Sequence, residues 1–129
     1  MEKFKIAIIG SRQFHDYDFI EQSILNKISL NEISCVISGA AKGVDALAVE
    51  FAGKHGLEMI EFPAQWEIYG KQAGYLRNTT IVENADIIFA FPMGVSNGTR
   101  DSIIKAREMN KVVYVYEIDR YKDKEKNLC

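Results

Sequence analysis

Short apolar runs alternate with amphipathic segments along most of the chain. The runs are rich in Ile, Val and Phe, a pattern typical of strands that are buried on both faces. We expect five such strands, at 4–9, 33–37, 57–62, 86–91 and 111–116. Between them, apolar residues recur every three or four positions, which predicts helices.

The helix boundaries follow from capping residues. Asp18 with Glu21 fits a capping box, which would open a helix with Phe19, Ile24 and Ile28 on its buried face. A second helix is expected over 44–55 with Gly56 as its stop, because glycine readily ends a helix. Further helices are expected over 74–84 and 99–109. The stretch 63–73 shows no clear periodicity and is predicted to be a long loop.

Strands that alternate with helices predict a parallel sheet covered on both faces. The fold class is therefore α/β, a single Rossmann-like three-layer domain with a five-stranded parallel sheet. Its simplest strand order is 3-2-1-4-5, and ligands of such folds bind where the order reverses, between strands one and four. We assign residues 1–117 to this domain and 118–129 to a charged C-terminal tail.

Three glycine-bearing segments follow predicted strands and precede predicted helices. A strand that turns sharply into a helix presents unpaired N–H groups and the positive end of the helix dipole, which together favour anions. In the strand order 3-2-1-4-5 the three segments lie side by side, which predicts a phosphate-bearing ligand. The segments are Gly10-Ser11-Arg12, Ser38-Gly39-Ala40-Ala41-Lys42-Gly43-Val44-Asp45 and Met93-Gly94-Val95-Ser96-Asn97-Gly98-Thr99.

Each candidate residue also has a purely structural interpretation. Arg12 either clamps a phosphate or is solvated beside a turn. Asp45 either accepts bonds from ribose hydroxyls or only complements the helix dipole. Asn97 or Thr99 would cap the last helix, a role that is compatible with phosphate binding.

The segment between the second and third glycine motifs adds aromatic and basic residues. Aromatic faces on which a nucleobase could stack are offered by Trp66, Tyr69 and Tyr75, although a role in the core or at a dimer interface is equally expected for each. Arg77 either binds the ligand, beside Asn78, or pairs with Glu83 or Asp86 at the surface.

Composition and charge exclude several classes of protein. Apolar residues make up 47% of the 129 residues, charged residues 26%, and the net charge is −2. The chain lacks a global electrostatic attraction to nucleic acid, so nucleic-acid binding is not favoured. No apolar run approaches the roughly 20 residues needed to span a bilayer. The two cysteines and two histidines are not spaced as metal ligands, so we expect no metal and no cofactor. The low cysteine content fits a reducing compartment, and together with the short apolar runs it predicts a cytoplasmic protein without membrane contact.

In order along the chain, several motifs resemble the YspA-type branch of the SLOG superfamily, which is named for its Smf/DprA and LOG members. They are Gly10-Ser11-Arg12, Ser38 to Asp45, Pro63-Ala64-Gln65-Trp66, Tyr69 to Asn78 and Gly98-Thr99. The resemblance implies a Rossmann-like pocket for nucleotides or their derivatives. Some relatives sense ADP-ribose-like signals in antiviral defence, which makes a receptor or a sequestering protein the expected function.

Two other branches define the alternatives. LOG-type enzymes cleave the N-glycosidic bond of nucleoside 5′-monophosphates with an arginine and a glutamate. Arg77 matches that arginine, but Ser102 occupies the glutamate position and Asp101 lies one residue away, so hydrolysis would have to use Arg77 and Asp101. DprA-type proteins share the Ser38–Asp45 stretch and the Arg77-Asn78 pair, and they bind single-stranded DNA.

We therefore expect a binding domain for a small phosphorylated nucleoside derivative, an ADP-ribose-like or cyclic nucleotide signal, in a protein that forms a homo-oligomer. N-glycosidase activity and single-stranded DNA binding remain the alternatives. The expected ligand-binding residues are Gly10, Ser11, Arg12, Ser38, Gly39, Ala40, Lys42, Gly43, Asp45, Trp66, Arg77, Asn78, Gly94, Ser96, Asn97, Gly98 and Thr99.

Overall fold

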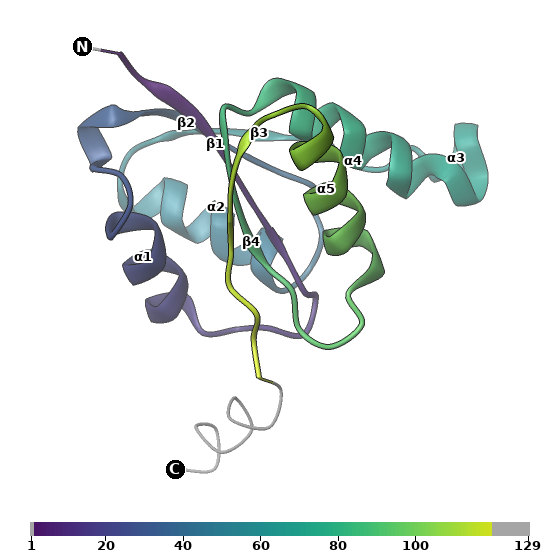
Figure 1. Cartoon of the computed structure of the whole chain (residues 1–129), viewed down its shortest axis with the longest axis horizontal. Helices are drawn as coiled ribbons and strands as arrows, with labels where there is room; N and C mark the ends of the chain where they lie inside the picture. The colour runs from purple at the N-terminus through teal and green to yellow at the C-terminus, as the bar shows by residue number, and fades with distance from the viewer. Residues whose placement is uncertain (1, 120–129) are drawn as a thin grey trace.

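Five parallel strands form one sheet in the order β3-β2-β1-β4-β5, which confirms the expected topology (Figure 1). The computed structural model describes residues 2–119. All four strand pairs are parallel. The strands are β1 (Phe4–Gly10), β2 (Ile33–Ser38), β3 (Glu58–Glu61), β4 (Ile87–Phe91) and β5 (Val112–Val115).

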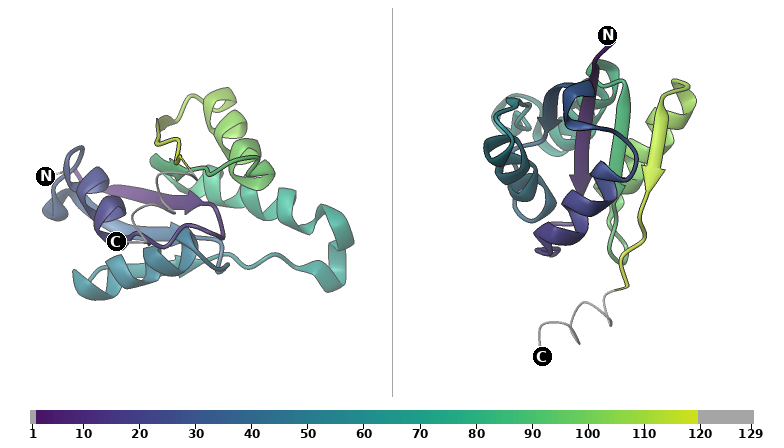
Figure 2. Two further views of the ribbon diagram at one scale, coloured as in Figure 1. Left: turned by 90° about the horizontal axis from the view of Figure 1, so that it is seen from below. Right: turned by 90° about the vertical axis from the view of Figure 1, so that its left-hand side faces the viewer.

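Helices cover both faces of the sheet, as expected for a three-layer fold. Ile6 and Ile8 of β1 belong to the core shared with α1 (Tyr17–Leu25) and α2 (Val44–Lys54). Ala7 and Ile9 point to the other face, where α4 (Ala73–Asn84) and α5 (Asn97–Glu108) pack. Figure 2 shows α2 and α5 on opposite sides of the sheet.

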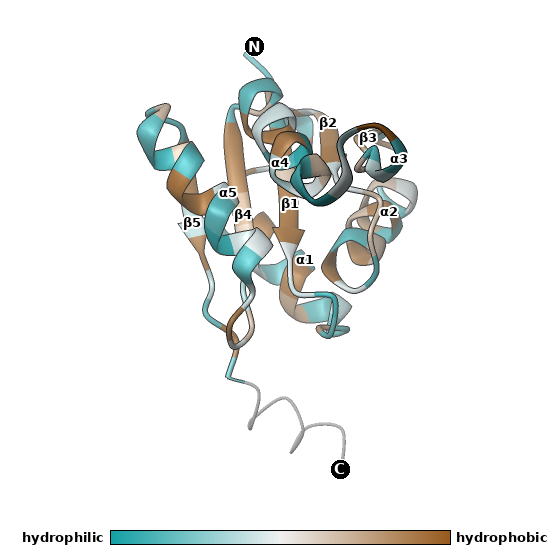
Figure 3. Ribbon diagram, turned by 90° about the vertical axis from the view of Figure 1, so that its right-hand side faces the viewer, coloured by the Kyte–Doolittle hydropathy of each residue, from teal (hydrophilic) through white to brown (hydrophobic). Residues whose placement is uncertain are grey.

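The central strand β1 and its neighbour β4 are hydrophobic over most of their length, as Figure 3 shows by colour. Ile6, Ala7 and Ile8 have no exposed surface, and neither do Ile88 and Phe89. Alternate residues of a strand point to opposite faces, so a strand between two helix layers needs apolar side chains at every position. Cys35 of β2 is also buried.

The start of α1 differs from the expected one. Asp16, not Asp18, is the N-cap, and its Oδ1 accepts a 3.2 Å bond from the N–H of Phe19. Both aspartates offer a capping oxygen, and sequence spacing alone selected the wrong one. The buried face of α1 carries Ile20 and Ile24, and Phe19 is half-buried against the same core, whereas Ile28 is buried beyond the end of the helix.

The predicted long loop before α4 is an extended arm with its own helical turns, and we call residues 63–72 the arm. It contains α3 (Trp66–Tyr69) and the 3-10 turn η2 (Gly70–Gln72). Another 3-10 turn, η1 (Leu30–Glu32), precedes β2. In both Figure 1 and Figure 2, α3 lies at an extremity of the molecule. Helical turns this short leave no periodic pattern in the sequence.

Ile118 still pairs with the chain beyond β4, because its N–H donates to the Pro92 carbonyl at 2.9 Å. Most of the expected tail, 120–129, lies outside the described residues, so the domain boundary at 117 stays a prediction. No helix within 2–119 is both long and apolar enough to cross a membrane.

Glu21, the residue expected in the capping box, instead links α1 to α2. Its carboxylate accepts a 2.6 Å bond from the Tyr17 hydroxyl and lies 2.9 Å from Lys54 Nζ and 3.1 Å from His55 Nε2. The Tyr17 bond, with help from Lys54, lowers the pKa of Glu21 from 4.5 to about 2.

A Glu21→Gln variant should lose about 1–2 kcal/mol of unfolding free energy at neutral pH, because hydrogen bonds to a charged acceptor would be weakened. A lowered folded-state pKa stabilises the fold above the unfolded value near 4.5, and the benefit fades as the pH falls toward 2. Urea unfolding at pH 7 and pH 3 should show the deficit shrinking in acid. An equal deficit at both pH values would contradict this assignment.

Candidate ligand cavity

A cavity of about 480 Å³ opens at the carboxyl ends of β1 and β4, where the strand order reverses. Small-molecule sites in doubly wound folds occupy this position. The cavity lies between the segments that follow these two strands and the facing sides of α4 and α5. Its lining residues are Ile9, Gly10, Ser11, Arg12, Gln13, Ala41, Asp45, Arg77, Asn78, Ile81, Met93, Gly94, Val95, Ser96, Asn97, Gly98, Thr99 and Ser102.

The first glycine segment is fixed against β4 and brings Arg12 to the cavity. The Ser11 N–H donates to the Phe91 carbonyl at 3.0 Å. A side chain at Gly10 would place its Cβ 2.6 Å from that same carbonyl oxygen, so the strand can end here only with glycine. Ser11 Oγ accepts a 3.1 Å bond from the Gln13 N–H. Arg12, which follows, is exposed and lines the cavity.

The second glycine segment supports the first segment more than it lines the cavity. The Val44 N–H at the start of α2 donates to the Ser11 carbonyl at 3.1 Å. Gly43 has a φ of 68°, and its Cα faces the backbone of Ser11 and Arg12 at close range. The first two glycine segments therefore adjoin each other, as the topology predicts. The absence of a side chain at Gly43 allows this close contact between the two segments. The prediction that the Gly43 backbone approaches an anion is not tested by it.

Only part of the second segment reaches the cavity. Ala41 and Asp45 line it. The other expected residues of this segment, namely Ser38, Gly39, Ala40, Lys42 and Gly43, do not. Ser38 is fully buried, and its hydroxyl is the single buried side-chain polar atom among residues 2–119 that has no hydrogen-bond partner. Lys42 is exposed outside the lining.

Asp45 and Arg77 meet over Gly39. Asp45 Oδ2 accepts a 3.1 Å bond from the Ala41 N–H, and Arg77 Nη1 donates to the Gly39 carbonyl. A Cβ on Gly39 would collide with the Arg77 guanidinium and lie 3.0 Å from Asp45 Oδ2. The arginine is thus directed inward, and the alternative of a surface pair with Glu83 or Asp86 is wrong.

Burial determines the electrostatics of this pair. Asp45 is only 7% exposed, and its burial raises the pKa of its carboxyl above the usual value despite the opposing effects of the Ala41 amide and Arg77. Burial also lowers the pKa of Arg77, against the attraction of Asp45, and the nearby Arg12 lowers it further. Two cations that repel each other at one cavity are a prepared site for an anion.

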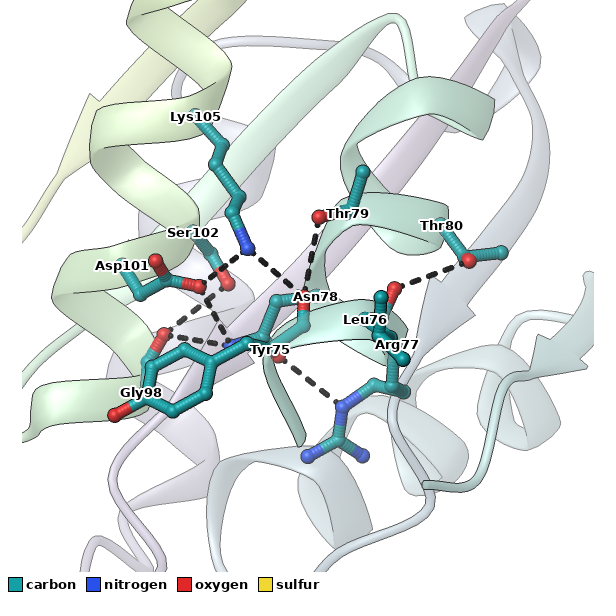
Figure 4. Close-up of polar contacts among 10 residues, drawn as sticks. All are labelled: Tyr75, Leu76, Arg77, Asn78, Thr79, Thr80, Gly98, Asp101, Ser102 and Lys105. Atoms are coloured by element: carbon teal, nitrogen blue, oxygen red, sulfur yellow. Dashed lines mark hydrogen bonds and ion pairs between the residues drawn. The ribbon is translucent and has the colours of Figure 1, made fainter. Parts of the chain in front are cut away.

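Asn78 connects Arg77 to the start of α5 (Figure 4). Its Oδ1 accepts a 3.1 Å bond from Arg77 Nε, and its Nδ2 donates to the Gly98 carbonyl at 3.1 Å and to Asp101 Oδ2 at 3.3 Å. Asp101 also pairs with Lys105 at 2.9 Å. The amide side chain therefore sets the position of Arg77 relative to the N-terminus of α5.

The third glycine segment presents the N-terminus of α5 to the cavity. Ser96, with a left-handed φ of 43°, is the N-cap, so the expectation of Asn97 or Thr99 as cap is wrong. The Ser96 side chain makes no capping bond and instead contacts Met93. Asn97, Gly98 and Thr99 all line the cavity. N–H groups in a first helical turn have no intrahelical acceptor, so this end of α5 favours an anion.

Arg100 holds this segment from outside the cavity. Its guanidinium donates to the Gly94 and Val95 carbonyls at 2.8 and 3.0 Å and binds Glu117 through two bonds of 2.7 and 3.0 Å. In a trans peptide the C=O and N–H point in opposite directions. The N–H groups of Val95 and Ser96 therefore point away from Arg100, and both residues line the cavity.

An Arg100→Gln variant should expose the third glycine segment to faster amide exchange. We expect the amides of 94–99 to exchange roughly 3- to 10-fold faster, because the bonds that fix the segment are lost. Hydrogen–deuterium exchange with mass spectrometry measures this directly. The control is Arg107→Gln in the last turn of the same helix. Unchanged exchange over 94–99 in Arg100→Gln would contradict the clamp.

Trp66 does not line this cavity. It lies at Gly74 on α4, where a Cβ would be 3.3 Å from the indole Cη2. No three His, Cys, Asp or Glu side chains in the described part of the chain are grouped to hold a metal ion.

Comparison with known proteins places the chain in a family. The sequence model described as the YspA, cpYpsA-related SLOG family matches residues 4–69. The Gene 61 protein of Mycobacterium phage D29 is 32% identical over 111 residues, which cover 81% of this chain and 89% of the phage protein. The chain belongs to the YspA, cpYpsA-related SLOG family. No solved structure matches it significantly.

The family match covers only one side of the cavity of this SLOG protein. Residues 4–69 include the first two glycine segments, whereas Arg77 and the third segment lie beyond them. The lining residues that were not among the expected ligand-binding residues are Ile9, Gln13, Ala41, Ile81, Met93, Val95 and Ser102. Ser102 is 2% exposed, and its hydroxyl donates to the Gly98 carbonyl at 3.2 Å. Its place one helical turn after Gly98 is the signal that could have identified it.

Proposed function

We propose that this SLOG protein binds a small phosphorylated nucleoside derivative, an ADP-ribose-like or cyclic nucleotide signal, as a sensor or a sequestering protein. The observation that supports it most strongly is one cavity that Arg12, Arg77 and the N-terminus of α5 all line. Two guanidinium groups and a helix N-terminus favour the same ligand chemistry, a phosphate.

The phosphate would lie on the Gly94–Thr99 segment, with Arg12 and Arg77 neutralising its charge. Asp45 would accept a bond from a ribose hydroxyl, because a carboxylate that already binds the Ala41 amide still has free lone pairs. Lys42 lies outside the cavity lining and is left without a direct role in this arrangement.

The side chains in and near the cavity support a binding function rather than N-glycosidic cleavage. Ser102, at the position of the family glutamate, carries a hydroxyl that cannot stabilise a developing positive charge as a carboxylate would. Asp101 is engaged by Asn78 and Lys105. Among the described residues that line the cavity, Asp45 carries the single carboxylate, and burial raises the pKa of that carboxyl.

Calorimetric titration with ADP-ribose, its cyclic isomers and cyclic dinucleotides tests the proposal. At least one should bind, and mass spectrometry of the denatured protein should identify any nucleotide that co-purifies. Arg12→Ala should weaken the affinity about tenfold or more, because a charge-assisted bond is lost. Lys42→Ala is the matched control, because Lys42 is an exposed cation of the adjacent segment. The affinity of this variant for the ligand should stay within about twofold of the wild-type value. If no ligand binds and none is released, the proposal fails.

The same preparation tests the two alternative functions. Incubation with AMP, GMP, CMP and deoxynucleotides should yield no free base. Base that forms with the wild type but not with Arg77→Ala would establish the hydrolase instead. Binding of a single-stranded oligonucleotide that weakens steeply with salt would establish the DNA-binding alternative.

Self-association also stays a prediction. The arm exposes large apolar side chains, with Trp66 at 53% and Ile68 at 69%, and such surface is often covered by a partner. Light scattering of the purified protein measures the oligomeric state directly.

A further inference from the structure

A second cavity, of about 450 Å³, lies on the other side of Arg77. It occupies the space between the arm, α4 and the segment that follows β3. Its lining includes Phe62, Gln65, Tyr69, Leu76, Thr80 and Glu83, together with Arg77. Its volume falls within the range of about 300–1,000 Å³ that is usual for small-molecule sites.

The two cavities follow one another along the carboxyl edge of the sheet. The first lies at the ends of β1 and β4, and the second lies beyond the end of β3. Between them, over the end of β2, Arg77 is bound to the Gly39 carbonyl and lines both cavities. The sheet order places β2 between β3 and β1. A ligand held by Arg77 can therefore extend from the first cavity toward the second.

The chemistry of the second cavity differs from that of the first. The charged groups of its described lining are Arg77 and Glu83, one of each sign, so it lacks the cationic excess of the first cavity. Tyr69 and Leu76 are 51% and 43% exposed and offer aromatic and aliphatic surface. Such a lining suits an uncharged planar group better than a phosphate.

Hydrogen-bonding groups surround that apolar surface. The Thr80 hydroxyl donates to the Leu76 carbonyl within α4 (Figure 4), which leaves its oxygen able to accept. Gln65 can both donate and accept, and Glu83 accepts. A nucleobase, whose edges carry donors and acceptors around a flat apolar ring, matches this combination.

We propose that the second cavity is the base subsite of the phosphorylated ligand, with Tyr69 as the residue on which the base stacks. The proposal rests on the proposed function, because the phosphate end must occupy the first cavity. Of the aromatic residues expected to stack on a base, it selects Tyr69 over Trp66, because Trp66 packs at Gly74 and lines neither cavity.

Titration with AMP and with ribose 5-phosphate tests the base subsite, because ribose 5-phosphate carries a hydroxyl group in place of the base. The wild type should bind AMP more tightly. Tyr69→Ala should lower the affinity for AMP roughly 5- to 100-fold, the usual range for losing one base–aromatic stack. It should leave the affinity for ribose 5-phosphate within about twofold, and Tyr69→Phe should retain most of the affinity for AMP.

Trp66→Ala is the matched control, since Trp66 is an equally exposed aromatic of the same short helix and should leave AMP binding unchanged. Three results would overturn the base subsite while leaving phosphate binding intact. These are equal wild-type affinities for the two compounds, an unchanged affinity of Tyr69→Ala for AMP, and an equal loss for both compounds. Absence of binding by AMP and ribose 5-phosphate, and by ADP-ribose, its cyclic isomers and cyclic dinucleotides as well, would instead overturn the proposed function, and the base subsite with it.

Discussion

A Gly43→Ala variant is expected to lose about 2–6 kcal/mol of unfolding free energy. Gly43 has φ 68° and ψ −124°, a backbone conformation that is almost confined to glycine and costs other residues about 1–3 kcal/mol. The added methyl group would also overlap the Ser11 carbonyl oxygen and the Arg12 backbone. Relieving that overlap requires backbone movement, for which overpacked sites lose a further 1–3 kcal/mol or so.

Gly53→Ala is the matched control for this prediction. Gly53 lies in the same helix, and a Cβ there would meet nothing within 4 Å. Because alanine favours a helix interior, this variant should gain about 0.5–1 kcal/mol. Urea unfolding followed by circular dichroism measures both changes. A Gly43→Ala variant within about 1 kcal/mol of the wild type would refute the close contact between the first two glycine segments.

The sheet could be predicted from the sequence because its signals are redundant. β1 and β4 are apolar at nearly every position, since both of their faces are buried. Alternation with helices then makes parallel pairing the simplest connection, and this pairing brings the segments after β1, β2 and β4 together. The place of the first cavity follows from topology alone.

The sequence could not predict which residues of the three glycine segments line the cavity and which make contacts with a neighbouring segment. The sequence shows glycine at 39 and 43, but it does not show which neighbour each glycine must accommodate. The structure brings Arg77 and Asp45 against Gly39, and the Ser11–Arg12 backbone against Gly43. These contacts join segments far apart in the chain, and the sequence does not show them. For that reason Lys42 was expected to bind the ligand although it does not line the cavity, and Ser102 was not expected although it does.

The arm and its cavity were missed for a different reason. α3 has four residues and none of them is buried, so no periodic apolar face marks it. The aromatic residues of 63–73 indicated a stacking surface, but sequence could not distinguish Trp66 from Tyr69. That distinction depends on which ring packs on Gly74 and which faces the space beside Arg77.

An Arg77→Met variant should lose about 2–3 kcal/mol of unfolding free energy at pH 7, apart from any loss of ligand binding. Methionine keeps much of the side-chain volume but removes the bond to the Gly39 carbonyl and the positive charge beside Asp45. The Asp45 carboxylate, which is only 7% exposed, would then keep the Ala41 and Gly39 backbone amides and the charge of Arg12 but lose the charge of Arg77. Removing one member of a buried pair of opposite charges usually costs more stability than replacing both members, because a single unpaired charge stays buried.

Adding Asp45→Asn to Arg77→Met should therefore recover part of the loss, with a coupling free energy of about 1–2 kcal/mol in the double-mutant cycle. The deficit should also depend on pH. Burial already raises the pKa of Asp45, and losing Arg77 should raise it further.

A raised folded-state pKa means that ionised Asp45 costs stability at neutral pH, and this cost disappears as the pH falls toward the unfolded value of about 3.9. Urea unfolding at pH 7 and pH 4.5 should thus show Arg77→Met approaching the wild type in acid, while the Asp45→Asn/Arg77→Met pair shows no such change relative to Asp45→Asn. A deficit that is independent of pH and unaffected by Asp45→Asn would mean that Arg77 stabilises the fold through the Gly39 bond alone. In that case Arg77 would leave more of its charge for the anion that the cavity is proposed to bind.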